Sequence, residues 1–198
     1  MIKRVEVQYR GVFQKTLGKY IGGDIVQIAS RMGKVAFSNG RYSDAPERNG
    51  IPCKYFAFVS PDLSEAELEA ECGSSYNADN VDVSVVVDDA MAQGVEPWGW
   101  HGIRPVNEKV GHKACLLVVT RRNHEHLLRF TAKKPQPYRL ATLEGDASMA
   151  GLWVFKDDLT RERCLGAVAA VDPGIISIEA VEEYLLDTGK DADRARAA

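Results

Sequence analysis

The pattern of apolar and polar residues changes its period near the start of the chain. Residues 5–9 alternate between apolar and polar side chains, which is typical of a strand. After Gly11 the apolar residues recur every three or four positions, which predicts a helix with one apolar face; they are Leu17, Ile21, Ile25, Ile28 and Met32. We expect Gly33 to end this helix, because glycine suits the left-handed position that follows many helices.

Further strands and helices then follow one another along the chain. Apolar, β-branched and aromatic runs predict strands at residues 35–37, 54–59, 81–87, 114–119 and 138–143. The run at 81–87 is apolar enough to be buried on both faces of a parallel sheet. Helices are expected at 64–71, after an N-cap at Asn123, at 159–171 and, after an N-cap at Ser177, at 177–187. Residues 94–113 are rich in Gly, Pro and Trp and predict an irregular surface excursion.

This order of elements predicts an α/β fold with a mainly parallel sheet and helices on both faces. We expect a single domain over residues 1–188 and a flexible tail over 189–198. In such sheets, ligands bind beyond the carboxyl ends of the strands, where the strand order reverses. The first strand–helix turn and the loop GRYSDAPERNGIP at 40–52 are both candidates for that edge. Asp88 and Asp89 also follow a buried strand, where they serve either as catalytic carboxylates or as a helix cap.

Composition narrows the classes of function. A formal charge of −3, from 25 basic and 28 acidic side chains, argues against a nucleic-acid or membrane-surface partner. No signal peptide or apolar run of about 20 residues occurs, so we expect a soluble, cytoplasmic protein. Cys53, Cys72, Cys115 and Cys164 are far apart, which supports neither disulfides nor a zinc or iron–sulfur site held by this chain alone.

Several side chains that could have a function also have an ordinary structural reading. His124 and His126 are two positions apart and make a poor metal pair on a helix, and His101 and His112 lie in the irregular region. The tryptophans either form a contact surface or are buried by their own loop; they are Trp98, Trp100 and Trp153. Cys53 is expected to be structural, with Lys54 on the opposite face of its strand.

Two longer stretches resemble a known family. GKVAFSNGRYSDAPERNGIPCKYFAFV and LGAVAAVDPGIISIEAVEEYL are similar to the gamma subunit or domain of 2-oxoacid:acceptor oxidoreductases, including the pyruvate and ketoisovalerate ferredoxin enzymes. The resemblance covers most of residues 3–60 and 160–187, and its most specific part is the Pro-Glu-Arg-x-Gly loop at 46–50.

The resemblance implies a Rossmann-like, three-layer α/β subunit of a thiamine-diphosphate enzyme that oxidatively decarboxylates a 2-oxo acid, usually to an acyl-coenzyme A. It implies alpha, beta and delta-type partner subunits, on which thiamine diphosphate, Mg and 4Fe-4S clusters would be bound. No cofactor is expected on this chain alone, although coenzyme A contacts are compatible with the family. Nucleic acid and membrane partners are not implied.

The departure from the family pattern concerns the first turn. Family members usually have Gly-Gly-Gln-Gly between the first strand and its helix, whereas here Gly11 is followed by Val-Phe-Gln-Lys-Thr. Side chains therefore occupy the space where bare backbone could approach a phosphate. Thr16 is a candidate cap of the helix and Lys15 a candidate anion contact, while Gly22 and Gly23 are expected to allow close helix packing. The departure suggests a less common branch, such as one acting on phenylglyoxylate or oxalate.

Arg41 and Arg48 complete the candidate contacts, because arginine can form two parallel hydrogen bonds to a carboxylate or phosphate. Their alternative is a local Glu47–Arg48 pair that only stiffens a surface loop. Two other functions stay open: a stand-alone nucleotide- or anion-binding α/β enzyme that uses the first turn, and a pure scaffold with no part in any site.

Overall fold

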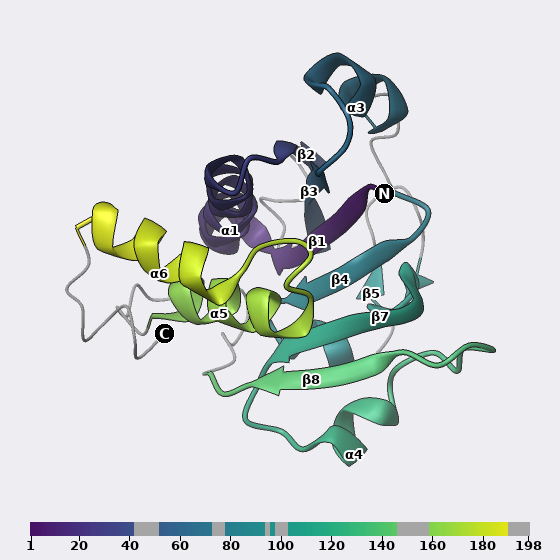
Figure 1. The fold of residues 1–198 in the computed structure, drawn as a ribbon. Coiled ribbons are helices and arrows are strands. Elements are labelled where there is room, and N and C mark those ends of the chain that lie inside the picture. Colours follow the sequence, from purple (N-terminus) through teal and green to yellow (C-terminus); the bar gives the residue numbers. More distant parts are fainter. Residues whose placement is uncertain (42–51, 73–77, 94–95, 98–102, 146–158, 190–198) are drawn as a thin grey trace.

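A computed structural model describes residues 1–41, 52–72, 78–93, 96–97, 103–145 and 159–189. Its centre is a six-stranded sheet with the strand order β2-β3-β1-β4-β7-β8 (Figure 1). These strands are β1 (Lys3–Arg10), β2 (Val35–Arg41), β3 (Pro52–Ser60), β4 (Val81–Val86), β7 (Val110–Val119) and β8 (Arg139–Leu143). A small second sheet pairs β5 (Glu96–Pro97) with β6 (Ile103–Arg104).

The sheet is mainly parallel, with one exception. β1, β4, β7 and β8 pair in parallel, whereas β3 runs antiparallel to both of its neighbours, β1 and β2. β3 therefore lies between two strands that are joined through a helix in the sequence. The expected α/β fold with a largely parallel sheet is confirmed, and the antiparallel insertion is a feature that the sequence pattern did not predict.

Helices cover both faces of the sheet (Figure 1). One face packs against α1 (Gly11–Arg31), α5 (Thr160–Val171) and α6 (Ile178–Asp187). The opposite face packs against α3 (Glu65–Cys72), the short 3-10 helix η1 (Met91–Gln93) and α4 (His124–Leu128). The three layers that the resemblance implied are therefore present.

A glycine with left-handed backbone starts helix α1, and another follows its end. Gly11 has a φ of +69° and turns β1 directly into the helix, and Gly33 has a φ of +73° after the last turn. Only glycine adopts this left-handed backbone without strain, so Gly33 has the predicted role. Thr16 lies inside the helix and is exposed, and the N-cap position is Arg10. The prediction that Thr16 caps the helix is therefore wrong, because the helix starts earlier than its apolar pattern.

The two adjacent glycines of α1 differ in their surroundings. A Cβ atom added at Gly22 would lie 2.5 Å from Cδ1 of Tyr55 on β3, whereas one added at Gly23 would meet no atom within 4 Å. The close-packing role is confirmed for Gly22 and is wrong for Gly23.

A polar contact links α1 to the C-terminal helices. The buried Asp24 carboxylate accepts hydrogen bonds from Arg161 Nε at 2.5 Å and Nη2 at 2.6 Å, and from the Tyr184 hydroxyl at 2.7 Å. Burial, together with the bond to Asp24, raises the pKa of Tyr184 to about 12, so the hydroxyl remains a donor at neutral pH. This network holds α5 and α6 against α1.

The second face of β1 contains a buried polar network. Glu6 and Gln8 are fully buried, although the alternating pattern allowed this face to be solvated. Glu6 accepts from Gln8 Nε2 at 2.8 Å, from Ser84 Oγ at 2.8 Å and from Lys54 Nζ at 2.9 Å. Cys53 lies in the core on the opposite face from Lys54, as predicted. β1 is therefore a central strand buried on both faces, with charge inside the second layer.

The remaining helix predictions are confirmed with small shifts. Asn123 caps α4 by accepting from the His126 amide, and Ser177 caps α6 by accepting from the Ala180 amide. Helix α4 ends at Leu128, so Phe130 lies beyond it and not within it. No helix within the described ranges is long and apolar enough to cross a membrane.

Candidate functional site

The reversal of strand order places a candidate site between the carboxyl ends of β1 and β4. From β1 the chain passes through α1 to β2 on one side, and from β4 it continues to β7 on the other side. Ligands of open α/β sheets bind at such a switch point. Here the end of β1 supplies Arg10 and the first turn of α1 supplies Gln14, while the segment after β4 supplies Asp88 and Asp89.

Gln14 bridges the two sides of this switch point. Its Oε1 accepts a hydrogen bond from the Arg10 backbone amide at 2.7 Å, and its Nε2 donates to Asp88 Oδ2 at 2.9 Å. The amide side chain is buried and follows the left-handed Gly11 by three positions. Gln14 therefore satisfies a backbone donor at the helix start that an anion would otherwise bind.

Asp88 both caps a turn and faces the switch point. Its Oδ1 accepts from the Ala90 amide at 2.9 Å, and its own carbonyl accepts from the Met91 amide, which begins η1. The capping interpretation is therefore confirmed for Asp88. Burial raises the pKa of this carboxyl, and the bonds from Gln14 and Ala90 and the nearby Arg10 charge only partly oppose that rise.

Asp89 has different partners. Thr120, which directly follows β7, donates its hydroxyl to Asp89 Oδ2 at 2.7 Å, and Arg122 Nε lies 3.5 Å from the same oxygen. The Thr120 hydroxyl also accepts from the Arg122 amide at 2.9 Å. Asp89 thus fixes the end of β7 to the end of β4, and its carboxylate does not act as a turn cap.

This arrangement does not fit a phosphate group. Two buried carboxyl groups lie at this switch point, and Gln14 takes the Arg10 amide at the start of α1. A phosphate or diphosphate bound here would lie beside the Asp88 and Asp89 carboxyl groups and could not use the Arg10 amide as a donor. We therefore assign no coenzyme A or nucleotide phosphate to the β1–β4 switch point.

The structure places the residues selected from the sequence in different ways. Lys15 lies on the first turns of α1, half-buried, and takes part in interactions of its own. Thr16 is exposed on the next position of the same helix. Arg41 is the last residue of β2, next to the start of β3, and Arg48 lies outside the described residues. The ends of β2 and β3 that flank residues 42–51 both lie at the carboxyl edge, because Arg10 pairs with Pro52.

Sequence reasoning missed Gln14 and Thr120 as members of this cluster. Gln14 follows Gly11 on an apparent strand–helix turn, and Thr120 directly follows a strongly apolar strand, so both positions were visible in the pattern. Their hydrogen bonds depend on which strands are neighbours, and the sequence did not determine the strand order. The tryptophans and His101 lie outside the described residues.

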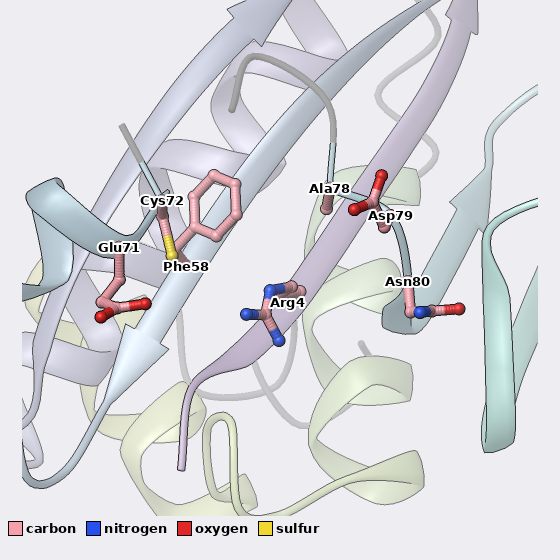
Figure 2. Close-up of a pocket in the computed structure, with 7 residues that line it drawn as sticks. All are labelled: Arg4, Phe58, Glu71, Cys72, Ala78, Asp79 and Asn80. Atoms are coloured by element: carbon pink, nitrogen blue, oxygen red, sulfur yellow. The ribbon is translucent and has the colours of Figure 1, made fainter. Parts of the chain in front are cut away.

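A cavity lies at the other end of these strands, near the amino ends of β1 and β4. It has a volume of about 300 Å³ and is lined by Arg4, Phe58, Glu71, Cys72, Ala78, Asp79 and Asn80 (Figure 2). Burial raises the pKa of the Cys72 thiol despite the opposing effect of Arg4, which disfavours the reactive thiolate. The cavity pairs one cation with two carboxyl side chains and shows no activated nucleophile among its lining residues.

Two histidines, His124 and His126, also have ordinary partners. His126 packs against Phe130 with 5.3 Å between ring centroids, and His124 Nε2 lies 3.4 Å from the Thr142 hydroxyl. Across the described ranges, no three His, Cys, Asp or Glu side chains are grouped so that they could hold a metal ion. The four cysteines are buried, and none of them forms a disulfide.

The architecture defines the chain as an open, mainly parallel α/β sheet with helices on both faces. Among solved structures, it is similar to the pyruvate oxidoreductase subunit PORC of Thermotoga maritima, with a TM-score of 0.64 and 19% sequence identity over 99% of this chain and 90% of that one. It is also similar to the gamma subunit of a keto/oxoacid ferredoxin oxidoreductase from Geobacter sulfurreducens PCA, with a TM-score of 0.59 and 17% identity over 100% and 91% of the two chains. No family model matches the sequence. At this identity the comparisons show a shared fold.

Proposed function

We propose that this chain is the gamma subunit of a multi-subunit 2-oxoacid oxidoreductase that depends on thiamine diphosphate. The observation that supports this most strongly is the fold similarity to two such subunits over essentially the whole length of all three chains. Similarity over almost the whole of each chain is more informative than similarity over the sheet alone, because it includes the helices as well as the strands. The Pro-Glu-Arg-x-Gly loop at 46–50 independently resembles the same family.

The role proposed for the subunit is architectural. Alpha, beta and delta-type subunits would hold thiamine diphosphate, Mg and 4Fe-4S clusters, and this chain would keep them in register and exclude water from the reacting centre. Thiamine diphosphate would supply the chemistry that breaks the bond to the departing carboxylate. The product would be an acyl-coenzyme A where coenzyme A is the acceptor, and phenylglyoxylate or another aromatic 2-oxo acid is the proposed substrate class.

Lys15, Thr16, Arg41 and Arg48 are the proposed contacts to a partner or to an acyl acceptor. Lys15 and Arg41 come from the carboxyl edge of β1 and β2, so a group bound beyond this edge could reach both. The Gln14–Asp88 hydrogen bond across the switch point supports binding of such a group away from it, nearer to the β2–β3 side of the sheet.

Isolation of the native assembly tests the proposal. A tag on this chain should recover subunits that contain thiamine diphosphate and iron–sulfur clusters, identified by mass spectrometry and by metal and cofactor analysis. The recovered complex should reduce a viologen dye only when a 2-oxo acid is present. Recovery of the chain as a stable monomer without such subunits would contradict the proposal.

The alternative is a stand-alone enzyme that binds a nucleotide or another anion at its first turn. The Gln14 bridge and the two Asp carboxylates argue against it. Calorimetry on the isolated chain separates the two functions, because only the alternative predicts affinity for nucleotides or coenzyme A without partner subunits.

A further inference from the structure

Positive charge is concentrated in one short part of this acidic chain. Residues 121–139 contain six Lys and Arg side chains against one Glu, a net charge of +5 in a chain of net charge −3. The cations are Arg121, Arg122, Arg129, Lys133, Lys134 and Arg139. All of them are exposed except Lys134, which is half-buried. We call this surface the basic pole.

The backbone of the basic pole is held in place by part-buried hydrogen bonds. The fully buried Asn107 donates from Nδ2 to the Ala132 carbonyl at 2.8 Å and accepts from the Ala132 amide at 2.9 Å. Lys134 Nζ donates to the Glu108 carbonyl, and the Tyr138 hydroxyl donates to Thr131 Oγ1 at 3.2 Å. Because this surface is already ordered, this chain would lose little conformational entropy when a partner binds to it.

Two exposed apolar side chains lie among these cations. Leu128 is 53% exposed and Phe130 is 38% exposed, and Arg129 separates them in the sequence. No hydrogen bond or ion pair within the described residues engages the side chain of Arg129 or Lys133. An apolar centre within a charged rim is the usual composition of a protein–protein interface.

The position of the basic pole also favours a protein partner. Helix α4 packs beside β8, which is the last strand of the sheet and pairs only with β7 among the described strands. Helix α3 lies on the same face near the opposite edge of the sheet, beside β2 and β3, in a stretch from residue 62 to 82 that contains seven acidic side chains and no Lys or Arg (Figure 1). The chain therefore has a strong charge asymmetry along its sheet, which steers and orients an oppositely charged partner.

We infer that the basic pole docks an acidic face of another subunit of the same assembly, with Leu128 and Phe130 at the centre of the contact. This inference rests on the proposed function for the identity of the assembly. A nucleic acid would also be attracted to the cations, but it would not use exposed Leu and Phe side chains flanking a single arginine beside an acidic Glu125.

Zero-length crosslinking of the tagged native assembly tests the inference. A carbodiimide joins a lysine amine to a carboxylate in direct contact, so Lys133 should be joined to Asp or Glu residues of another subunit. Arg129→Glu and Lys133→Glu should each lower the recovery of that subunit by at least about tenfold, since each places like charges together. Lys19→Glu makes the same charge change at an exposed position of α1 and should leave recovery unchanged.

A neutral variant separates protein docking from general charge attraction. Leu128→Ser keeps every charge and should also lower recovery, because it removes apolar area from the centre of the contact. Raising the salt concentration from about 0.05 M to about 0.5 M should weaken the wild-type contact more than the Arg129→Glu contact.

Each contrary outcome has a distinct meaning. If thiamine-enzyme subunits are recovered but Lys133 is not crosslinked and its variants bind normally, the inference is wrong and the proposed function stands. If Lys133 is joined only to an acidic protein that is not such a subunit, the inference is wrong, and recovery of the thiamine-enzyme subunits decides separately whether the proposed function stands. Crosslinks only to residues 65–71 of a second copy of this chain would overturn the inference. Bound nucleic acid that Arg129→Glu releases and Leu128→Ser retains would overturn it as well.

Discussion

Asp88 is a carboxyl group that folding brings into an unfavourable environment for charge. Because burial raises its pKa above the ordinary value of 3.8, the folded chain holds this proton more tightly than the unfolded chain. The contribution of Asp88 to stability is therefore fully present at pH values below the ordinary pKa, and it is lost as the pH rises through the raised pKa. The free energy of unfolding of the wild type, relative to Asp88→Asn, should fall as the pH rises from about 4 to about 8. Urea titrations at several pH values measure this difference.

Glu67 supplies a control of opposite sign. Hydrogen bonds from the Ser64 hydroxyl and amide, at 2.6 and 2.8 Å, lower the pKa of this exposed carboxyl at the start of α3. The contribution of Glu67 to stability is present above its ordinary pKa and is lost as the pH falls through the lowered pKa. The free energy of unfolding of the wild type, relative to Glu67→Gln, should therefore rise as the pH rises. If the stability difference from the wild type changed with pH in the same direction for both variants, the raised pKa of Asp88 would be contradicted.

Lys54 compensates a charge inside the sheet layer. The Glu6 carboxylate is fully buried, and Lys54 Nζ at 2.9 Å is its cationic partner. We expect Lys54→Met to lower the free energy of unfolding by about 3–5 kcal/mol, because it leaves the Glu6 carboxylate uncompensated. Lys3→Met removes a part-exposed pair with Asp172 and should cost about 1 kcal/mol or less. Adding Glu6→Gln to Lys54→Met should recover part of the loss, and denaturant titrations of the three variants and the wild type check this.

At the scale of elements, Gly22 and Gly23 offer a matched pair on one turn of α1. Gly22→Ala would force a methyl group into the Tyr55 ring, so we expect a loss of about 1–3 kcal/mol. Gly23→Ala adds a methyl group in open space and should stabilise the chain by up to about 1 kcal/mol through helix propensity. Thermal and urea unfolding of the two variants measure both changes, and two shifts of the same sign would contradict this packing of α1 on β3.

The sequence predicted most elements but not their pairing. Caps at Asn123 and Ser177 and the left-handed Gly33 are local features, and local patterns therefore located them well. The antiparallel insertion of β3 between β1 and β2 depends on pairing between distant strands, which no periodicity records. The burial of Glu6 could not be predicted for the same reason, because its partners Lys54 and Ser84 come from two neighbouring strands.

The candidate site shows the same division. Asp88 was located because it follows a buried strand, and its capping role follows from its own local turn. The bond from Gln14 was invisible, since it joins the ends of two strands that become neighbours only in the folded sheet. Because Gly11 is followed by residues with side chains, the sequence predicted that the first turn does not bind a phosphate through bare backbone. It did not indicate that Gln14 would bond to the Arg10 amide and to Asp88.

At the scale of the whole molecule, substitutions of Arg48 test whether this residue docks a neighbouring subunit or contributes to a binding site. It belongs to the Pro-Glu-Arg-x-Gly loop, which carries the most specific resemblance to the gamma subunits. We expect Arg48→Ala to weaken assembly of the native complex by roughly 10- to 100-fold, because an arginine that makes two hydrogen bonds to a partner carboxylate typically contributes about 1.5–3 kcal/mol. Arg48→Lys should restore little of this, since lysine does not reproduce the planar pair of bonds.

The kinetic constants of the assembled complex then decide between the two roles. If Arg48 only docks a neighbouring subunit, complex reconstituted at high subunit concentration should have wild-type KM values for the 2-oxo acid and the acyl acceptor. If Arg48 binds the acyl acceptor, the KM for that acceptor should rise at saturating assembly while the KM for the 2-oxo acid stays unchanged. The end of β2 and the start of β3, which flank this loop in the sequence, lie at the same end of the sheet as the carboxyl end of β1. They are on the far side of β1 from β4 and the Asp88 cluster. An acceptor contact at Arg48 would therefore be separate from the Asp88 cluster, and Asp88→Asn should leave the acceptor KM unchanged under either outcome.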